Sequence, residues 1–572
     1  MRRAALAVFL CAAPLVAGTA QASTGMVERA ALREALRQHA HAAANGVVKL
    51  PLPEPPRVSA AAASRGLARL ARSQGPERLL VGVRSHGDVD GVAAKLRSLG
   101  AEPERFDTIA VLAARVPSAA EAIAALRDDA RVAYVERDEP LRVAVEPFDI
   151  PDLETGRKFT WAYDTVRAGE ALAAVSGGSA RTVSVIDTGL DVTHPEFAGQ
   201  VQQAFDTEAG NSNVTDIVGH GTFVTGLIAA RDGNTIGGKG VAGTTKVLAV
   251  RASRDREGRF TLADLITGIE FSIRRGADVI NMSLAGTGFT RSHARALEAA
   301  FFNDVLPVAA SGNNAENGNP LEFPAAAVGG RRGGRGIGLS VAATKPDGSV
   351  ASFSNHNPFV SLAAPGASQT DCRYGVFSTI PSSTDPPWDA GGCPKTFTDP
   401  SGSRFAYGEG TSFAAPIVSG LAALAWQAER RLASEQVADV LVRAATGGGW
   451  NEFTGAGVVD GMQAVEIARI YDVLGPRARA RTRRRGNRVR VTLRRSRDRT
   501  LAGDELSGAV TYGLLVSRDG GRSYRVIASR RPRPFSRRVA ITGSRANLLV
   551  TTACDGNGNC GVKRLGRFRR FR

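Results

Sequence analysis

The middle of the chain alternates short apolar strands with helices, and this alternation restricts the fold more than any other feature. The predicted strands are nearly continuous in Val, Ile and Ala, which is typical of strands buried on both faces of a sheet. Strands separated by helices form parallel sheets with helices on both faces. We therefore predict an α/β fold with a doubly wound parallel sheet. The strands are 182–186, 246–250, 279–282, 306–310 and 339–343, and the helices are 262–274, 292–302, 412–427 and 434–445.

The chain has 572 residues, which is more than one compact core usually organises, so further folding units are expected. Residues 78–143 have a β-α-β-α-β pattern and predict a small α+β unit. Its elements are 79–83, 89–99, 109–113, 119–126 and 132–136. After residue 476, Arg-rich alternation predicts a small β domain with Asp519-Gly520-Gly521 as a hairpin turn. Its strands are 489–494, 511–516, 524–528 and 547–551.

The first 22 residues have the pattern of an export signal. Arg2 and Arg3 precede an apolar run at 4–15, and Ala20-Gln21-Ala22 has the small-x-small pattern of a cleavage site. A short buried helix is the alternative interpretation. No later apolar stretch reaches the roughly 18 to 20 residues that a membrane-spanning helix needs. We expect a secreted protein, extracellular or associated with the cell envelope, without a membrane span.

Removal of the signal would also remove Cys11 and leave four cysteines. An even number of cysteines in an exported chain favours disulfides. The simplest pairs are Cys372–Cys393 and Cys554–Cys560, because each pair is close in sequence. A zinc site is disfavoured because the sequence has no C-x-x-C motif or nearby His cluster.

The net charge of +18 is concentrated in the C-terminal part of the chain. Residues 476–572 contain 27 Lys or Arg and 5 Asp or Glu, a net of +22, so the preceding residues carry −4. A solvated, Arg-rich β domain is one interpretation, and a weak anchor to anionic cell-surface polymers is another. Nucleic acid is disfavoured as a partner, because aromatic residues are few and an exported protein meets cell walls and lipid headgroups first.

Three residues have the chemistry of an acyl-transfer site. Asp187 ends a predicted buried strand, where active sites of open α/β sheets form. His220 lies between two glycines before a predicted helix, and Ser412 begins an apolar helix. A Ser hydroxyl becomes a nucleophile when a His accepts its proton and an Asp orients that His. Each residue also has an ordinary structural interpretation: a strand-end turn for Asp, a satisfied histidine, and a helix N-cap for Ser.

The motifs D-T-G at 187–189, H-G-T at 220–222 and G-T-S-x-x-x-P at 410–416 occur together in one order. In order and local sequence they resemble the subtilisin-like serine protease family, the subtilases, over residues 160–470. The resemblance implies a serine endopeptidase in which this Asp, His and Ser form the catalytic triad. A lipase or esterase is excluded, because G-x-S-x-G is absent around Ser412. A non-catalytic binding protein on the same fold is the rival hypothesis.

The same resemblance assigns further roles. Asn313 would form the oxyanion hole together with the backbone N–H of the nucleophile. Ser283, Leu284 and Ala285 on one side, and Gly258 on the other, would pair with an extended polypeptide substrate. No cofactor is required for this chemistry. Relatives often bind structural calcium, but its ligands in this sequence are unknown.

Residues 77–145 resemble the inhibitory propeptide of the family, including the stretch 134–138. This implies a self-processed zymogen whose own propeptide acts as an intramolecular inhibitor, with cleavage between about residues 139 and 158. A permanent N-terminal domain is the alternative. The predicted organisation is a signal peptide (1–22), a low-order Ala/Arg/Pro-rich lead-in (23–76), an inhibitory propeptide (77–145), a processing linker (146–158), a subtilisin-like catalytic domain (159–472) and a basic C-terminal β domain (473–572).

Departures from the family pattern concern the cleft. Phe223, Phe413 and Ile417 replace residues that are often His, Met and His, so the motifs do not determine the shape of the substrate pocket. The segment 366–410 is longer than in compact relatives and contains Cys372 and Cys393. It is either a loop that narrows the cleft or a surface insertion. We expect a broad, apolar substrate preference and best activity at neutral to mildly alkaline pH, because the His must be neutral to act as a base.

Overall fold

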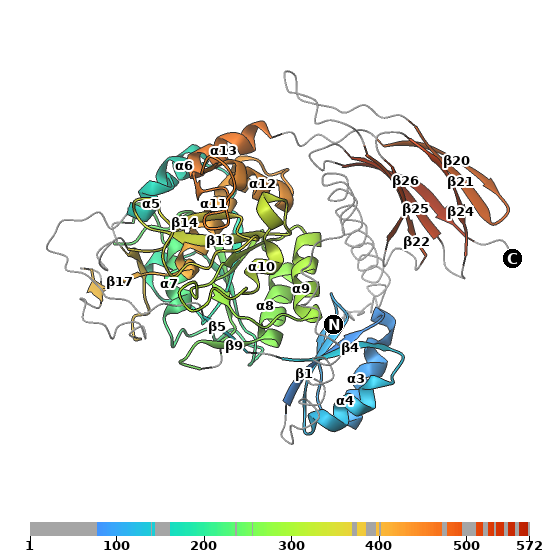
Figure 1. Cartoon of the computed structure of the whole chain (residues 1–572), viewed down its shortest axis with the longest axis horizontal. Helices are drawn as coiled ribbons and strands as arrows, with labels where there is room; N and C mark the ends of the chain where they lie inside the picture. Colours follow the sequence, from blue (N-terminus) through green and yellow to red (C-terminus); the bar gives the residue numbers. More distant parts are fainter. Residues whose placement is uncertain are drawn as a thin grey trace, which may run out of the picture. The chain divides into compact units, whose positions relative to one another are not determined.

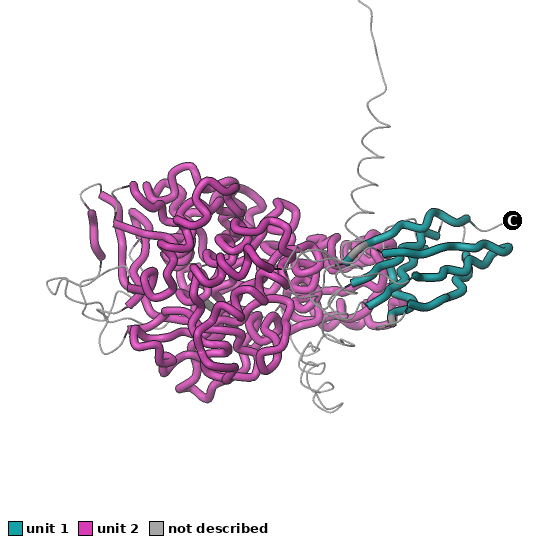
Figure 2. Tube along the Cα trace, turned by 90° about the horizontal axis from the view of Figure 1, so that it is seen from above, with its two compact units in different colours: residues 1–49, 472–572 teal, residues 50–471 magenta. Residues whose placement is uncertain are grey.

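The computed structural model divides the chain into two compact units, residues 50–471 and residues 1–49 with 472–572 (Figure 2). The predicted signal peptide, lead-in and processing linker, and the proposed Cys372–Cys393 pair, lie outside the described residues. The structure describes residues 77–138, 140–143, 161–234, 237–253, 255–368, 375–384, 396–399, 402–471, 478–494, 511–518, 524–530, 534–542, 547–554 and 560–569.

A nine-stranded sheet forms the centre of the larger unit, in the order β18-β19-β14-β13-β12-β10-β6-β8-β7. Figure 1 labels β13 and β14 of this sheet, with helices around them. All neighbours are parallel except β18 and β19. The predicted parallel sheet is therefore confirmed, and the five predicted strands match within one residue. The bounds are β6 (Thr182–Asp187), β7 (Val201–Asp206), β8 (Lys246–Arg251), β10 (Val279–Met282), β12 (Leu306–Ala310), β13 (Leu339–Thr344), β14 (Leu362–Pro365), β18 (Ala445–Thr446) and β19 (Val458–Val459).

Helices cover the central sheet, and their burial follows their sequence. Every residue of α7 is buried, as expected for a helix that is apolar on all sides. α8 begins with a capping box, in which Thr261 and Asp264 satisfy each other's backbone N–H groups. The bounds are α5 (Trp161–Thr165), α6 (Ala168–Ala174), α7 (His220–Ala229), α8 (Leu262–Arg274), α9 (Arg291–Phe302), α10 (Ala325–Val328), α11 (Thr411–Ala428), α12 (Ser434–Arg443) and α13 (Gly461–Ile470).

The small α+β unit has one strand more than predicted. All five predicted elements are present, but the antiparallel sheet has the order β2-β3-β1-β4, so the element order is β-α-β-β-α-β and not β-α-β-α-β. The missed strand β2 is three residues long and begins Glu-Arg, so it has no apolar run to reveal it. The strand predicted at 109–113 starts at Val111, because Ala110 has a φ of 52°. The bounds are β1 (Glu77–Val83), α3 (Val89–Ser98), β2 (Glu104–Phe106), β3 (Val111–Val116), α4 (Ala119–Arg127) and β4 (Val132–Arg137).

The two faces of this small sheet have different neighbours. One face packs under α3 and α4, with Leu79, Val81 and Leu112 in the core. On the other face, Leu80 and Phe106 belong to the same apolar cluster as residues of α8 and α9. The small unit therefore rests on two helices of the central sheet.

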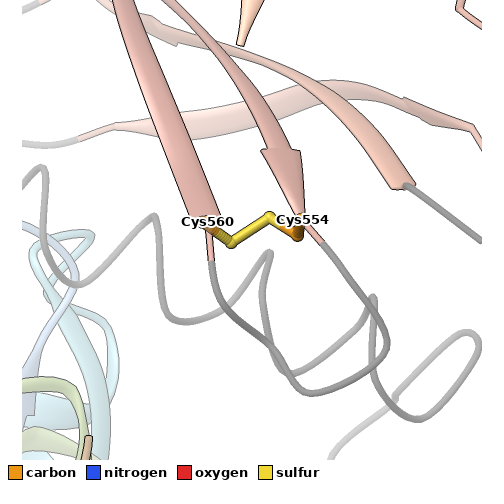
Figure 3. Close-up of a disulfide and its surroundings, with 2 residues drawn as sticks. All are labelled: Cys554 and Cys560. Atoms are coloured by element: carbon orange, nitrogen blue, oxygen red, sulfur yellow. A yellow bond between two sulfur atoms is a disulfide. The ribbon is translucent and has the colours of Figure 1, made fainter. Parts of the chain in front are cut away.

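The C-terminal unit consists of two antiparallel sheets, β20-β21-β24 and β23-β22-β25-β26, which share one apolar core. The predicted small β domain is present, and β20, β24 and β26 were not predicted. The disulfide between Cys554 and Cys560 joins β25 to β26, as expected from their proximity in sequence (Figure 3). The bounds are β20 (Arg479–Arg485), β21 (Arg488–Arg494), β22 (Thr511–Ser517), β23 (Arg525–Arg530), β24 (Ser536–Ala540), β25 (Asn547–Cys554) and β26 (Cys560–Phe568).

Candidate active site

Three neighbouring strands of the central sheet end next to one another at the same edge. β6 ends at Asp187, β10 is followed by Ser283, and β12 leads to Asn313. Because parallel strands have their carboxyl ends at one edge of the sheet, these three segments converge. Residues far apart in sequence are thereby gathered at one place.

Asp187 and His220 form a buried pair. His220 Nδ1 lies 2.7 Å from Asp187 Oδ1, and the side chains are 0% and 1% exposed. The backbone N–H of Thr188 also donates to Asp187 Oδ1, at 2.7 Å. His220 begins α7, and a Cβ added to Gly221 would lie 3.2 Å from Asp187 Cβ and overlap the backbone of Gly189. The glycine after the histidine thus permits the close approach of α7 to the end of β6.

Ser412 is the second residue of α11 and does not cap the helix, since Gly410 occupies the N-cap position. Its Oγ donates to the carbonyl oxygen of Ser283 at 3.2 Å, and Ser283 Oγ donates to the carbonyl oxygen of Ser412 at 2.7 Å. The ring of Phe413 lies 5.5 Å from the ring of His220. Ser412 is therefore fixed to the end of β10, and its neighbour in sequence contacts the histidine.

The side chain of Asn313 has a defined orientation. Its Oδ1 accepts hydrogen bonds from the backbone N–H and the hydroxyl of Thr411, at 2.9 and 2.8 Å. Because the amide oxygen is engaged by the residue preceding Ser412, the NH2 group is the end that can donate to a bound carbonyl. The hydrogen bonds also join the loop after β12 to the start of α11.

A network that the sequence analysis missed supports this loop. Asn355 donates from its backbone to Gly312 O at 2.9 Å and accepts at Oδ1 from the N–H of Asn314 at 2.7 Å. The carboxylate of Glu322 accepts from the side-chain amides of Asn355 and Asn314, at 2.8 and 3.0 Å. Burial raises the pKa of Glu322, and the two amides oppose this shift. The network therefore holds the backbone on both sides of Asn313.

Asp216 is a second missed residue, and it is 2% exposed. Its Oδ1 accepts from Thr188 Oγ1 and from the backbone N–H groups of Val218 and Gly219, at 2.9, 3.1 and 2.7 Å. Its Oδ2 accepts from the N–H and hydroxyl of Thr222, at 2.8 and 2.7 Å. One carboxylate thus joins the residue after Asp187 to the first turn of α7. An acid just before a predicted helix was the only local signal for it.

The residues predicted to bind substrate lie beside a strand of the chain itself. β5 (Pro140–Val143) pairs antiparallel with β11 (Leu284–Ala285) and with β9 (Arg259–Thr261). Gly258 has a φ of 64° and precedes β9, so the pairing begins one residue later than predicted. Leu284 and Ala285 belong to β11, and Ser283 lies directly before it.

The three positions that depart from the family pattern, Phe223, Phe413 and Ile417, lie in the core. Phe223 and Phe413 are fully buried, and their ring centroids are 4.3 Å apart. Ile417 is 1% exposed. Phe413 thus packs against the ring of His220, and Phe223 packs against Phe413.

The described parts of segment 366–410 form a small antiparallel sheet, β15-β17-β16 (Val376–Thr379, Arg404–Gly408 and Phe397–Thr398). β15 contacts α7, since Ser378 Oγ donates to Phe223 O at 2.7 Å and Thr379 Oγ1 donates to Thr222 O at 2.9 Å.

In the part of the chain that the structure describes, no three His, Cys, Asp or Glu side chains are grouped to hold a metal ion. Among the same residues, no helix is long and apolar enough to cross a membrane.

Comparison with known proteins gives the family. The model of the Subtilase family matches residues 178–457. A thermophilic serine proteinase of Bacillus sp. (strain AK1) is 35% identical over 268 residues, 46% of this chain and 57% of that protein. Subtilisin DY of Bacillus licheniformis is 30% identical over 297 residues, 52% of this chain and 94% of that protein. Thermitase of Thermoactinomyces vulgaris is 31% identical over 252 residues, 44% of this chain and 76% of that protein. The chain therefore belongs to the subtilase family and is a subtilisin-like serine endopeptidase.

Proposed function

We propose that the protein is a secreted serine endopeptidase, made as a self-processed zymogen, that hydrolyses peptide bonds through an acyl-enzyme on Ser412. The observation that carries the proposal is the buried pair of Asp187 and His220, 2.7 Å apart, at the sheet edge where α11 presents Ser412. Substrates are polypeptides bound in an extended conformation. The chemistry requires no cofactor.

Each group has one role in the reaction. Ser412 Oγ attacks the carbonyl carbon of the scissile bond while His220 accepts its proton. His220 then donates that proton to the leaving amine, and water repeats the sequence to release the acyl group. Asp187 holds the histidine in the required tautomer and stabilises its charged form. The Asn313 amide and the Ser412 N–H stabilise the oxyanion.

Two carboxylates support the assignment of residues 77–145 as a propeptide. Glu136 accepts hydrogen bonds from the N–H groups of Arg291 and Ser292 at the start of α9, at 2.9 and 3.3 Å. Asp138 accepts from the N–H of Ala263 at the start of α8, at 2.7 Å. Negative charge is favourable at a helix N-terminus, so the contact of Glu136 stabilises the association, and Asp138 adds a hydrogen bond to it. They hold the domain next to the cleft that β5 occupies.

The register of β5 leads to one processing site. Arg142 lies opposite Ala285, and Val143 lies opposite Leu284. A chain that continues this antiparallel register brings its next residue opposite Ser283, whose carbonyl oxygen contacts Ser412 Oγ. The next residue in the sequence is Ala144. Processing is therefore expected at the bond between Ala144 and Val145.

The test is to express the full chain with its export signal, side by side with Ser412→Ala, under oxidising conditions with calcium. The wild type should gain an N-terminus at Val145 and digest casein, whereas Ser412→Ala should stay intact and inert. Ser176→Ala, an exposed serine of the same unit, is the matched control and should behave as wild type. Casein digestion by a chain that keeps residues 77–144 would refute the proposal that the protein is made as a zymogen, but not the proposal that it is a protease. An intact and inert wild type would refute the enzymatic function itself.

A further inference from the structure

One face of the C-terminal sheet β20-β21-β24 carries arginines at alternate positions. Every second residue of β20 from Arg479 to Arg485 is an exposed arginine, whereas Ala480 is buried. On β21 the exposed positions 488, 490 and 494 are arginines, and the residues between Arg488 and Arg494 are alternately buried and exposed. Successive strand residues point to opposite faces of a sheet, so these arginines share the outward face. The inward face forms the apolar core of the unit.

The pairing of the strands places these arginines directly opposite one another. Arg483 lies opposite Arg490, and Arg490 lies opposite Arg538 of β24. Arg479 lies opposite Arg494 in the same way. Like charges in directly opposed positions destabilise a sheet. A stable unit with this arrangement gains free energy when an anion binds across the rows.

Among the described residues of this sheet, none on the outward face carries a negative charge. The other outward residues are Thr492, Ser536 and Ala540, and Thr492 Oγ1 is hydrogen-bonded to Ser536 Oγ at 3.0 Å. In the described part of the chain, none of the outward arginines of β20 and β21 forms an ion pair, and neither does Arg538. Their guanidinium groups are thus available for a ligand that carries many negative charges.

The spacing of the rows matches a particular polymer. Alternate residues of a strand are about 6.6 to 6.8 Å apart, and neighbouring strands are about 4.8 Å apart. Three backbone bonds of an extended chain span about 3.3 to 3.6 Å, so six bonds span about 7 Å. A phosphodiester polymer with three-carbon spacers has six bonds per repeat. Consecutive phosphates of such a polymer would meet consecutive arginines of one strand.

The chemistry of the face narrows the choice of ligand. The planar guanidinium group binds phosphate through two parallel hydrogen bonds. A single nucleic-acid strand also has six backbone bonds per phosphate, but its bases gain affinity by stacking on aromatic side chains. The outward residues of the three strands include no aromatic side chain and no large apolar side chain. Insertion into a lipid bilayer therefore has no anchor on this face.

We propose that the outward face of β20-β21-β24 binds a linear, base-free polyphosphodiester of the kind exposed on cell envelopes. This gives the C-terminal unit a binding function that is separate from peptide hydrolysis and does not depend on Ser412. Affinity would come from several phosphate contacts at once, so it should fall steeply with salt. A protease held in this way would act near the surface to which it is bound.

The experiment measures binding of the full chain, carrying Ser412→Ala to prevent self-cleavage, to immobilised poly(glycerol phosphate). Binding should be tight at 50 mM salt and lost on raising the salt, with each phosphate contact contributing roughly 0.7 to the slope of log K against log salt. The variant Arg483→Gln/Arg490→Gln should bind roughly three- to tenfold more weakly. Its salt slope should be lower by about 1 to 2. Arg127→Gln/Arg331→Gln is the matched control, because both arginines are exposed in the other unit and the change in net charge is equal.

Each outcome distinguishes a different source of binding. Equal weakening by the test and control variants would show that net charge alone acts, and would overturn the proposal. Tighter binding to single-stranded DNA or to anionic phospholipid vesicles than to poly(glycerol phosphate) would also overturn it, in favour of that ligand. Thermal unfolding tests whether the variant is correctly folded. Arg483→Gln/Arg490→Gln removes repulsion between like charges, so it should unfold at the same or a higher temperature than the parent protein.

Discussion

Replacing Asp216 with Asn tests whether this buried carboxylate positions His220. The carboxylate accepts three hydrogen bonds at Oδ1 and two at Oδ2. An amide has only one acceptor oxygen, so its NH2 group must face donors in either orientation. With the oxygen in the place of Oδ1, the NH2 group faces the N–H and the hydroxyl of Thr222. The hydroxyl can rotate to accept, but the backbone N–H cannot.

The expected cost follows from this count. One buried backbone donor without a partner costs about 1 to 3 kcal/mol. The bonds that remain also lose the extra strength of an ionised acceptor, which adds about 1 kcal/mol. We therefore expect Asp216→Asn to lower the free energy of unfolding by about 2 to 4 kcal/mol. Since α7 begins at His220, a shift of about 1 Å at its first turn should lower kcat roughly 10- to 100-fold.

The assay combines urea unfolding with steady-state hydrolysis of a short peptide substrate. A positioning role predicts that kcat falls while KM changes little, because β9 and β11 lie outside the network of Asp216. Asp191→Asn is the matched control. Asp191 accepts four hydrogen bonds, from Thr193 and Ser382, where Asp216 accepts five, and it is partly exposed. Its replacement should cost less than about 1 kcal/mol. An Asp216→Asn enzyme that loses stability but keeps its kcat within twofold of the wild-type value would refute the positioning role.

Two further predictions concern pH. Burial lowers the pKa of His293 to about 3. As the pH falls, this histidine binds a proton in the unfolded chain before it does so in the folded chain. The free energy of unfolding should therefore decrease as the pH falls from about 6.5 towards 3. His293→Leu should flatten this loss in urea unfolding at pH 4 and 7, and an unchanged slope would contradict the assignment. Burial, opposed by Arg78, raises the pKa of Asp138 to about 6 in the associated state. Association should therefore weaken as pH rises from about 4 to 6. Asp138→Asn should abolish that step in size-exclusion chromatography of the processed protein, whereas a retained step would point to another group.

The central sheet could be predicted because its strands are buried on both faces. β10 and β12 are buried along their whole length, and Asn281 is the one polar residue in their sequences. The missed strands lack this signal. β7 lies at the edge of the sheet and contains Gln202 and Gln203, and β24 has four exposed residues of five. Their pairing is decided by the neighbouring strands, which a local pattern does not contain.

The same distinction applies to the site. Asp187, His220 and Ser412 stand in short motifs, so local sequence revealed them. Gly189 and Gly221 are required by close backbone approach, and Gly410 has a φ of 153°. Asp216 and Glu322 act through partners distant in sequence. Asp216 binds Thr188, 28 residues away, and Glu322 binds Asn355, 33 residues away. A single acid in a loop has no pattern that distinguishes it from a solvated acid, and only the folded chain reveals its donors.

Cleavage alone would not open the cleft. β5 is paired on both sides, with β9 and β11, and the bond expected to be cut lies at its C-terminal end. The contacts of Glu136 and Asp138 with α9 and α8 lie on the other side of β5 in sequence, so cutting leaves them intact. In the proposed zymogen, cleavage would remove only the covalent link that keeps the local concentration of residues 77–144 high. Release therefore depends on the strength of these contacts, and protonation of Asp138 is one part of that strength that the surrounding pH changes.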